Sequence, residues 1–185
     1  MLNNTQLWDL AGRMNIPLTF VGFKDQLKDE ILEYNKAYII NLDNEFDEEG
    51  SRNEGSHWTC FQMNKDEENG KVKGIYMDSY GTIYPEAVKD FVGRDIPYTK
   101  KDIQSLMGNA CGFFCLAFLH YINAYGDRKR NVYEDTEDFL ELFEDLNTSV
   151  DWKQNEYVLK MFFQSSDPNK RKPIEVFDNV NNIQN

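Results

Sequence analysis

Apolar and polar positions at the start of the chain follow a helical period. The apolar residues of 5–14 recur at three- and four-residue spacing and stop before Pro17, which predicts a short first helix. A second helix is predicted to begin near Asp25 and to bury Leu27 and Ile31.

The period then changes to that of strands. Residues 36–43 form a β-branched and aromatic run, and the acidic stretch 43–55 after it predicts a loop. Two further strand-like runs, 57–64 and 71–81, are joined by a charged connection that ends in glycine, which predicts an antiparallel hairpin. The start of one hairpin strand lies beside the end of the other, so His57 is expected to neighbour Asp78.

A long apolar segment follows, in which residues 111–124 are apolar on every side over the first three turns. This pattern is typical of a helix buried in the middle of a domain. Helical patterns also occupy residues 85–93, 134–146 and 154–164, the first of them between a proline and a glycine.

The length of 185 residues suits one domain, predicted to span residues 1–166, with a weakly ordered C-terminal tail at 167–185. A net charge of −12, from 20 basic and 32 acidic residues, disfavours nucleic acids and anionic membranes as partners. Three cysteines and no apolar leader predict a reducing, intracellular setting. The longest apolar run, 110–119, is shorter than the roughly 18 residues that span a bilayer, which predicts a soluble protein.

Cys111 heads the apolar helix, where the positive end of the helix dipole favours a thiolate. The small residues Gly108, Asn109 and Ala110 give a tight approach to it, and Gly112 is expected to leave space beside the sulfur for a substrate. Most free cysteines are nevertheless buried packing residues, and the helix alone slightly favours that interpretation.

A nucleophilic cysteine needs a base, and the chain holds two histidines. His120 follows Cys111 by nine residues on the same helix, roughly 13 Å along the axis and on the opposite face. His57 is left by elimination, with Asp78 in reach to orient it. Gln104 lies upstream of Cys111 across a flexible link, where its amide and the Cys111 backbone N–H can face one carbonyl oxygen.

The other two cysteines have no evident activating group. Cys115, one turn deeper on the same helix, is expected in the core, and Cys60 is expected to pack on one face of the sheet. A zinc site is disfavoured because no CxxC pair occurs, so no metal is expected.

Taken in order, His57-Trp58, Asp78 before "SYG", Gln104 and "ACGFFC" resemble the adenovirus-type maturation cysteine proteases, a family related to the SUMO-type proteases. The acidic, Asn-rich sequence looks closest to the virophage and Polinton branch. The resemblance implies an α+β fold in which a mostly antiparallel sheet packs against a central buried helix that carries the nucleophile at its N-terminus, with further helices on its flanks.

The same resemblance implies a role for each motif residue. Cys111 would be the nucleophile, His57 the general base and acid, Asp78 its orienting carboxylate, and Gln104 with the Cys111 N–H the oxyanion hole. Trp58 would shield or position the histidine, and Trp58, Gly108, Asn109 and Gly112 would contact the substrate. The implied activity is that of a viral cysteine endopeptidase that cuts capsid or other virion precursors after a small residue, commonly glycine. It would act as a monomer, in the virion and in the host-cell cytoplasm or viral factory.

The sequence departs from the patterns of these two families at two positions. Asp78 replaces the Glu of adenovirus enzymes, and Ala110 replaces the Asp that precedes the nucleophile in SUMO-type proteases. Adenovirus enzymes respond to an activating peptide and to DNA. The charge of −12 disfavours DNA here, and no cofactor is expected.

Two alternatives stay open. The same chemistry could serve a deubiquitinase or SUMO-type isopeptidase. In a different class of function, the chain would be a non-catalytic acidic protein-binding module with Cys111 merely buried.

Overall fold

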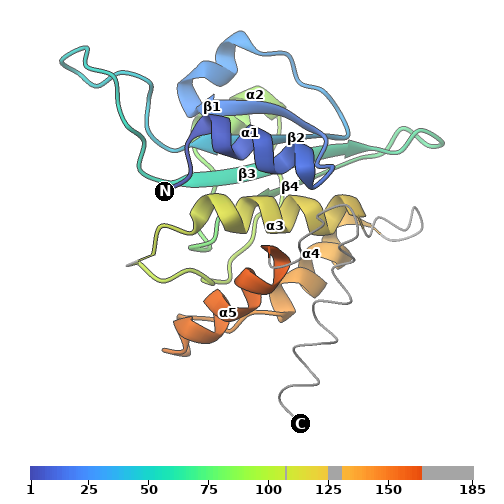
Figure 1. Cartoon of the computed structure of the whole chain (residues 1–185). Helices are drawn as coiled ribbons and strands as arrows, with labels where there is room; N and C mark the ends of the chain where they lie inside the picture. Colours follow the sequence, from blue (N-terminus) through green and yellow to red (C-terminus); the bar gives the residue numbers. More distant parts are fainter. Residues whose placement is uncertain (107, 125–130, 164–185) are drawn as a thin grey trace.

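A four-stranded sheet separates two groups of helices in the computed structural model, which describes residues 1–106, 108–124 and 131–163 (Figure 1). The strands are β1 (Leu18–Phe23), β2 (Lys36–Asn41), β3 (Trp58–Lys65) and β4 (Val72–Met77), and they lie side by side in chain order. β1 pairs with β2 in parallel, whereas the β2–β3 and β3–β4 pairs are antiparallel. The expected α+β class with a mostly antiparallel sheet is confirmed.

Alternation of side chains along the strands divides the core into two parts. Ala37, Ile39 and Cys60 point to the face covered by α3, and Tyr38 and Phe61 point to the other face. Four helices lie on the side of the first face: α1 (Asn4–Arg13), α3 (Cys111–Ala124), α4 (Val132–Glu141) and α5 (Trp152–Phe163), the last of which packs on α3. The second is covered by the 3-10 helix η1 (Lys24–Asp29) and by α2 (Glu86–Val92).

Helix α3 is the central helix that the apolar pattern predicted. It runs between the sheet above and α4 and α5 below (Figure 1). Ten of its 14 residues are buried. Side chains pack on it from both sides because no face of it is polar enough to meet water, and this burial fixes the position of its first residue, Cys111.

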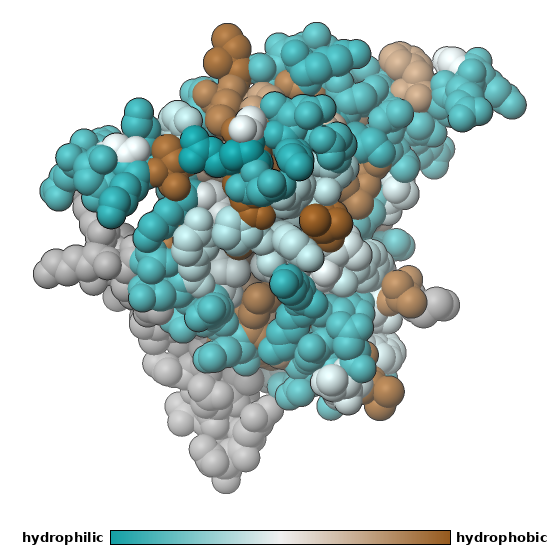
Figure 2. Space-filling view, turned by 180° about the vertical axis from the view of Figure 1, so that it is seen from behind, coloured by the Kyte–Doolittle hydropathy of each residue, from teal (hydrophilic) through white to brown (hydrophobic). Residues whose placement is uncertain are grey.

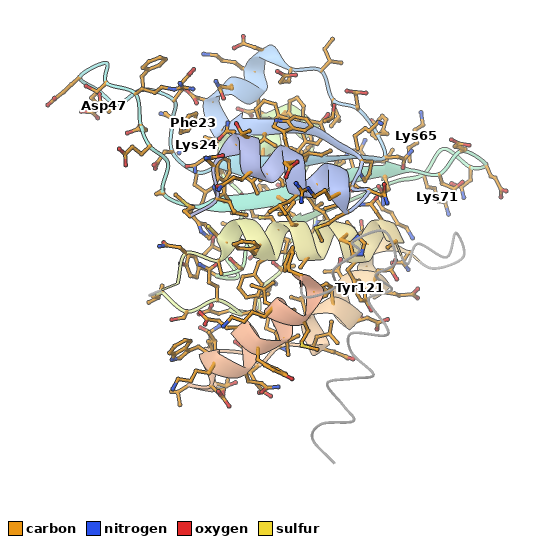
Figure 3. The ribbon with its side chains drawn as sticks, in the orientation of Figure 1. Phe23, Lys24, Asp47, Lys65, Lys71 and Tyr121 are labelled. Atoms are coloured by element: carbon orange, nitrogen blue, oxygen red, sulfur yellow. The ribbon has the colours of Figure 1, made fainter. Side chains whose placement is uncertain are left out.

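The predicted hairpin is present as β3 and β4. Its register pairs Cys60 with Met77 and ends with Lys65 opposite Val72. The turn, flanked by Lys65 and Lys71, projects from one end of the sheet, and Asp47 in the acidic loop projects from the other (Figure 3). His57 and Asp78 therefore lie at the same end as the acidic loop.

Two predictions near the N-terminus need correction. The segment before Asp25 contains strand β1, which the sequence reading did not identify. The helix expected after it is the short η1, in which Leu27 is buried while Ile31 lies beyond the helix end and is 85% exposed. One buried leucine anchors the segment, too little apolar surface for a longer amphipathic helix.

The surface seen from behind is mostly hydrophilic, with apolar residues scattered over it (Figure 2). In the part of the chain that the structure describes, none of the helices combines the length and the apolar character needed to cross a membrane. The predicted C-terminal tail, 167–185, lies outside the described residues.

Candidate active site

His57 and Asp78 meet where the hairpin strands begin and end. His57 directly precedes β3 and Asp78 directly follows β4, and the Nε2 atom of the imidazole lies 2.7 Å from Oδ1 of the carboxylate. Both residues are buried, with 8% and 1% of their surface exposed. Because a carboxylate only accepts hydrogen bonds, Nε2 carries the hydrogen, and Nδ1 is left to face another partner.

That partner is Cys111, the first residue of α3. Its side chain hydrogen-bonds with the His57 ring, and the backbone N–H groups of Trp58 and Gly112 donate towards its sulfur. The helix start adds the positive end of the macrodipole. The sulfur thus faces an imidazole and several N–H donors, the surroundings that favour a thiolate.

The electrostatics of this trio favour a charged pair. Burial works to lower the pKa of His57, but the hydrogen bonds with Asp78 and Cys111 outweigh it and raise that pKa to about 9. Burial works to raise the pKa of the Cys111 thiol, yet the His57 hydrogen bond and the nearby backbone donors bring it below its ordinary value. At neutral pH the arrangement therefore favours an imidazolium beside a thiolate.

Asp78 is held by a tight turn as well as by His57. Its carboxylate accepts hydrogen bonds from the backbone N–H of Tyr80 and from the hydroxyl of Thr82, and its own backbone N–H donates to the Thr99 hydroxyl. Although burial opposes ionisation, these donors and His57 keep the pKa of Asp78 below its usual range. The carboxylate stays charged and cannot rotate away from the imidazole.

Tyr80 is a member of the site that the sequence analysis missed. Its ring stacks on the imidazole of His57, with 4.5 Å between ring centroids and 25° between ring planes. The signal was present in "DSYG", which places an aromatic residue two positions after the acid. Only the backbone turn after β4 brings that ring back over His57, and a sequence pattern does not specify this.

Gln104 lies within the same site and is 2% exposed. Its Oε1 accepts a hydrogen bond from the Ser79 hydroxyl at 2.7 Å. Its Nε2 donates to the Tyr80 hydroxyl oxygen at 3.2 Å and to the Gly108 carbonyl oxygen at 3.0 Å. Since the carbonyl can only accept, these contacts fix which end of the amide faces the loop before Cys111.

Four residues were predicted to contact a substrate, and the structure places them differently from one another. Trp58 is buried, and its indole N–H donates to the Leu2 carbonyl at 2.8 Å. Gly112 is also buried, and a Cβ added there would lie 3.2–3.3 Å from Leu7 and Leu2. The space beside Gly112 is therefore filled by the N-terminal segment, which corrects the expectation that it is open to a substrate.

Gly108 and Asn109 lie in the loop that leads into α3. Gly108 is partly exposed and Asn109 is exposed. Asn109 and Ala110 also line a mainly apolar cavity of about 430 Å³ between α3 and α5, with Glu156 and Lys160 on its opposite wall. This loop is thus accessible from outside, as an approach to the sulfur has to be.

The remaining cysteines and the second histidine are not part of the group formed by His57, Asp78 and Cys111. Cys60 and Cys115 are both buried, with the Cys60 sulfur 3.9 Å from the Cys115 carbonyl oxygen, and burial raises the pKa of Cys115. His120 donates from Nδ1 to the Met14 carbonyl at 3.0 Å. Among the described residues, no three His, Cys, Asp or Glu side chains form a group that could hold a metal ion.

Comparison with known proteins gives no family assignment. No family model and no curated protein matches the chain. Two solved structures are similar in outline. The first, an AvrA delL154 structure with IP6 and CoA, is 16% identical with a TM-score of 0.47, and the match covers 95% of this chain and 77% of the AvrA chain. The second, the ASFV pS273R protease, is 15% identical with a TM-score of 0.40, and the match covers 78% of this chain and 68% of the protease chain. TM-scores below 0.5 assign no common family.

Proposed function

We propose that the protein is a cysteine peptidase in which Cys111 is the nucleophile, His57 the general base and acid, and Asp78 the orienting carboxylate. One observation carries this proposal: a single imidazole hydrogen-bonds both to a buried carboxylate and to a thiol at a helix N-terminus. A purely structural cysteine has no need of such a charge partner.

Acylation would use the thiolate directly. Its sulfur attacks the carbonyl carbon of the substrate, a C–S bond forms, and the carbonyl π electrons move to oxygen. The intermediate then collapses, the C–N bond breaks, and the His57 imidazolium gives its proton to the departing amine. Asp78 holds the ring in place and stabilises its positive charge while this proton is in transit.

Deacylation would reverse the proton's path. Neutral His57 takes a proton from water as the water oxygen attacks the thioester carbon. The C–S bond then breaks, the acid product leaves, and the thiolate beside the imidazolium is restored. No group other than water is consumed, so the site needs no cofactor for this reaction.

For the substrate, we propose a virion precursor protein cut after a small residue, within an infected cell or the virion. The resemblance of His57-Trp58, Asp78, Gln104 and "ACGFFC" to the adenovirus-type proteases supports this assignment. A ubiquitin-like conjugate is the competing substrate for the same chemistry. An activating peptide is compatible with this proposal, whereas the charge of −12 argues against DNA.

The test is cleavage by the purified full chain of three substrates: a virion precursor and fluorogenic ubiquitin and SUMO derivatives. We expect cleavage of the precursor, and loss of at least about 10³-fold in kcat in Cys111→Ala, because the variant lacks the sulfur that forms the acyl-enzyme. Cys60→Ala removes a buried thiol outside the site and should keep its activity.

Each outcome decides between the candidates. Cleavage of only the ubiquitin or SUMO derivative would replace the virion substrate with a conjugate. If Cys111→Ala cleaves as fast as the parent chain, the assignment of the nucleophile is wrong. If the parent chain cleaves none of the three and Cys111 alkylates like an ordinary thiol, the protein is not a cysteine peptidase.

A further inference from the structure

The hydrogen-bond donors of Gln104 are already in use. An amide nitrogen carries two hydrogens. In this structure Nε2 donates to the Tyr80 hydroxyl oxygen at 3.2 Å and to the Gly108 carbonyl oxygen at 3.0 Å. The Gln104 amide thus has no third hydrogen for a substrate oxygen.

A peptidase of this kind needs such a donor. The oxygen of the attacked carbonyl becomes negative, and donors placed beforehand around it stabilise that charge. The backbone N–H of Cys111, at the start of α3, is one donor, because the first N–H groups of a helix lack intrahelical partners. A side-chain donor is expected on the side of Gln104.

Tyr80 supplies a hydrogen at that place. Its oxygen accepts from Gln104, and a phenol that accepts can still donate its own hydrogen. Over residues 1–106, 108–124 and 131–163, the bond from Gln104 is the one hydrogen bond found at this hydroxyl, so its hydrogen is not committed to a protein acceptor there. The side chain is half-buried, and its ring lies against the imidazole that hydrogen-bonds with Cys111, so the hydroxyl belongs to the same site as the sulfur.

We propose that Tyr80 is a catalytic residue of the peptidase: its O–H donates a hydrogen bond to the substrate oxygen, while Gln104 holds the hydroxyl by donating to it. This inference rests on the proposed function. The phenol gives no proton away, so the steps of acylation and deacylation keep their balance. Ser79 has a positioning part, since its hydroxyl fixes the far end of the Gln104 amide at 2.7 Å.

The environment of Tyr80 suits a hydrogen-bond donor. Burial, together with the nearby charge of Cys111 and Asp78, raises the pKa of the Tyr80 hydroxyl. The phenol therefore keeps its hydrogen throughout the neutral range. A hydrogen bond from Gln104 to the phenol oxygen makes the remaining O–H a better donor, because neighbouring hydrogen bonds in a chain polarise one another.

The competing view gives Tyr80 no direct contact with the substrate oxygen. In that view Gln104 leaves one of its present partners and donates to the oxygen itself. Tyr80→Phe separates the two. It removes only the hydroxyl and keeps the ring on His57. Under the competing view it frees one amide hydrogen, so kcat stays level or rises.

The experiment compares the parent chain, Tyr80→Phe and the control Tyr98→Phe, with the substrate that the parent chain cleaves. For Tyr80→Phe we expect kcat to fall by about 10²-fold with KM little changed, as for the loss of one oxyanion donor. The rate of Cys111 alkylation against pH should match that of the parent chain, since the ring remains. Tyr98→Phe should behave as the parent chain, because the Tyr98 ring packs against Tyr84 in the core on the other face of the sheet.

Three results would overturn the inference. One is an unchanged or increased kcat in Tyr80→Phe. The second is a shifted alkylation profile in that variant, which would mean that the hydroxyl acts through His57. The third is equal binding of a peptide aldehyde to Tyr80→Phe and the parent chain, since the oxygen of its adduct with Cys111 takes the place of the oxyanion. An inactive parent chain would instead count against the proposed function.

Discussion

His57 lies between two groups that both favour its positive charge. The Asp78 carboxylate is 2.7 Å from Nε2 of the ring, the Cys111 side chain hydrogen-bonds with the ring, and the Tyr80 ring covers one face. Burial opposes the charge, but Asp78 and Cys111 together raise the pKa of His57 to about 9. Each partner therefore acts on the reactivity of the sulfur through a single imidazole.

Alkylation of Cys111 should report this arrangement directly. A lowered pKa keeps the thiolate populated as pH falls, so iodoacetamide should react with Cys111 well below pH ~8.5, the ordinary midpoint of a thiol. Asp78→Asn removes the charge that favours the imidazolium and should move the midpoint upwards. The measurement is the alkylation rate from pH 5 to pH 10, with peptide mass mapping to locate the label.

Asp102→Asn is the matched control for this experiment, because it neutralises an acid that accepts a hydrogen bond from the Gln104 backbone and makes none with His57. Its midpoint should stay with that of the parent chain. A parent-chain midpoint near 8.5, or a downward move in Asp78→Asn, would show that the thiol is not activated by the imidazole.

The part of the site that the sequence specified is the trio, together with the presence of Gln104 beside it. Cys111 was marked by its place at a helix start, and His57 and Asp78 by their places in one hairpin. The contacts of Tyr80 and of Gly112 depend on a turn and on packing with the N-terminal segment. Such contacts arise only when distant parts of the chain meet.

At the scale of elements, the turn after β4 holds the acidic and aromatic members of the site together. The backbone N–H of Gly81 donates to the Asp78 carbonyl at 2.9 Å and closes the turn. Gly81 has a φ of +71°, and a Cβ there would lie 2.5 Å from the Lys100 carbonyl oxygen. This position thus requires glycine both for its backbone conformation and for the close approach of another segment.

Gly81→Ala should therefore destabilise the protein and misplace Asp78 and Tyr80. We expect the free energy of unfolding to fall by more than about 2 kcal/mol, from left-handed strain and steric overlap together. Gly93→Ala is the matched control, with a φ of +73° and nothing within 4 Å of its Cβ, and should cost about 1 kcal/mol. Urea unfolding measures both, and equal losses would contradict the steric part of this account.

Helices and strands with a clear period of apolar residues could be predicted from the sequence. Elements defined by contacts with distant segments could not. The hairpin and α3 follow from alternation and from a long apolar run. β1 was missed because it is an edge strand whose parallel partner, β2, is set by the fold and not by a turn between them. The helix predicted near Asp25 was too long, because the apolar spacing continues to Ile31 whereas the helix η1 ends at Asp29 and buries only Leu27.

At the scale of the whole molecule, part of the negative charge is concentrated in a loop beside the site. The loop of residues 43–55 joins β2 to His57 at the site's end of the sheet. Its charged residues are Asp43, Glu45, Asp47, Glu48, Glu49, Arg52 and Glu54. Because acidic side chains dominate a loop next to the site, the field there favours the approach of basic polypeptides.

Cleavage should therefore depend on salt in a way set by the substrate's charge. For a peptide with lysines or arginines flanking the scissile bond, kcat/KM should fall several-fold between about 50 and 500 mM NaCl, because salt screens the attraction. The same peptide with neutral flanks is the control and should change little. An equal fall for both peptides would mean that the loop does not steer the substrate.

The hydrogen bond between Cys111 and His57 crosses the boundary between two layers, since Cys111 begins α3 and His57 directly precedes strand β3 of the sheet. The reactivity of the thiol therefore measures how closely those layers are docked. A chain that kept its strands and helices but let α3 drift from the sheet would hold an ordinary, slow thiol. An electrophile added during refolding would thus time the final docking step, separately from the earlier gain of secondary structure.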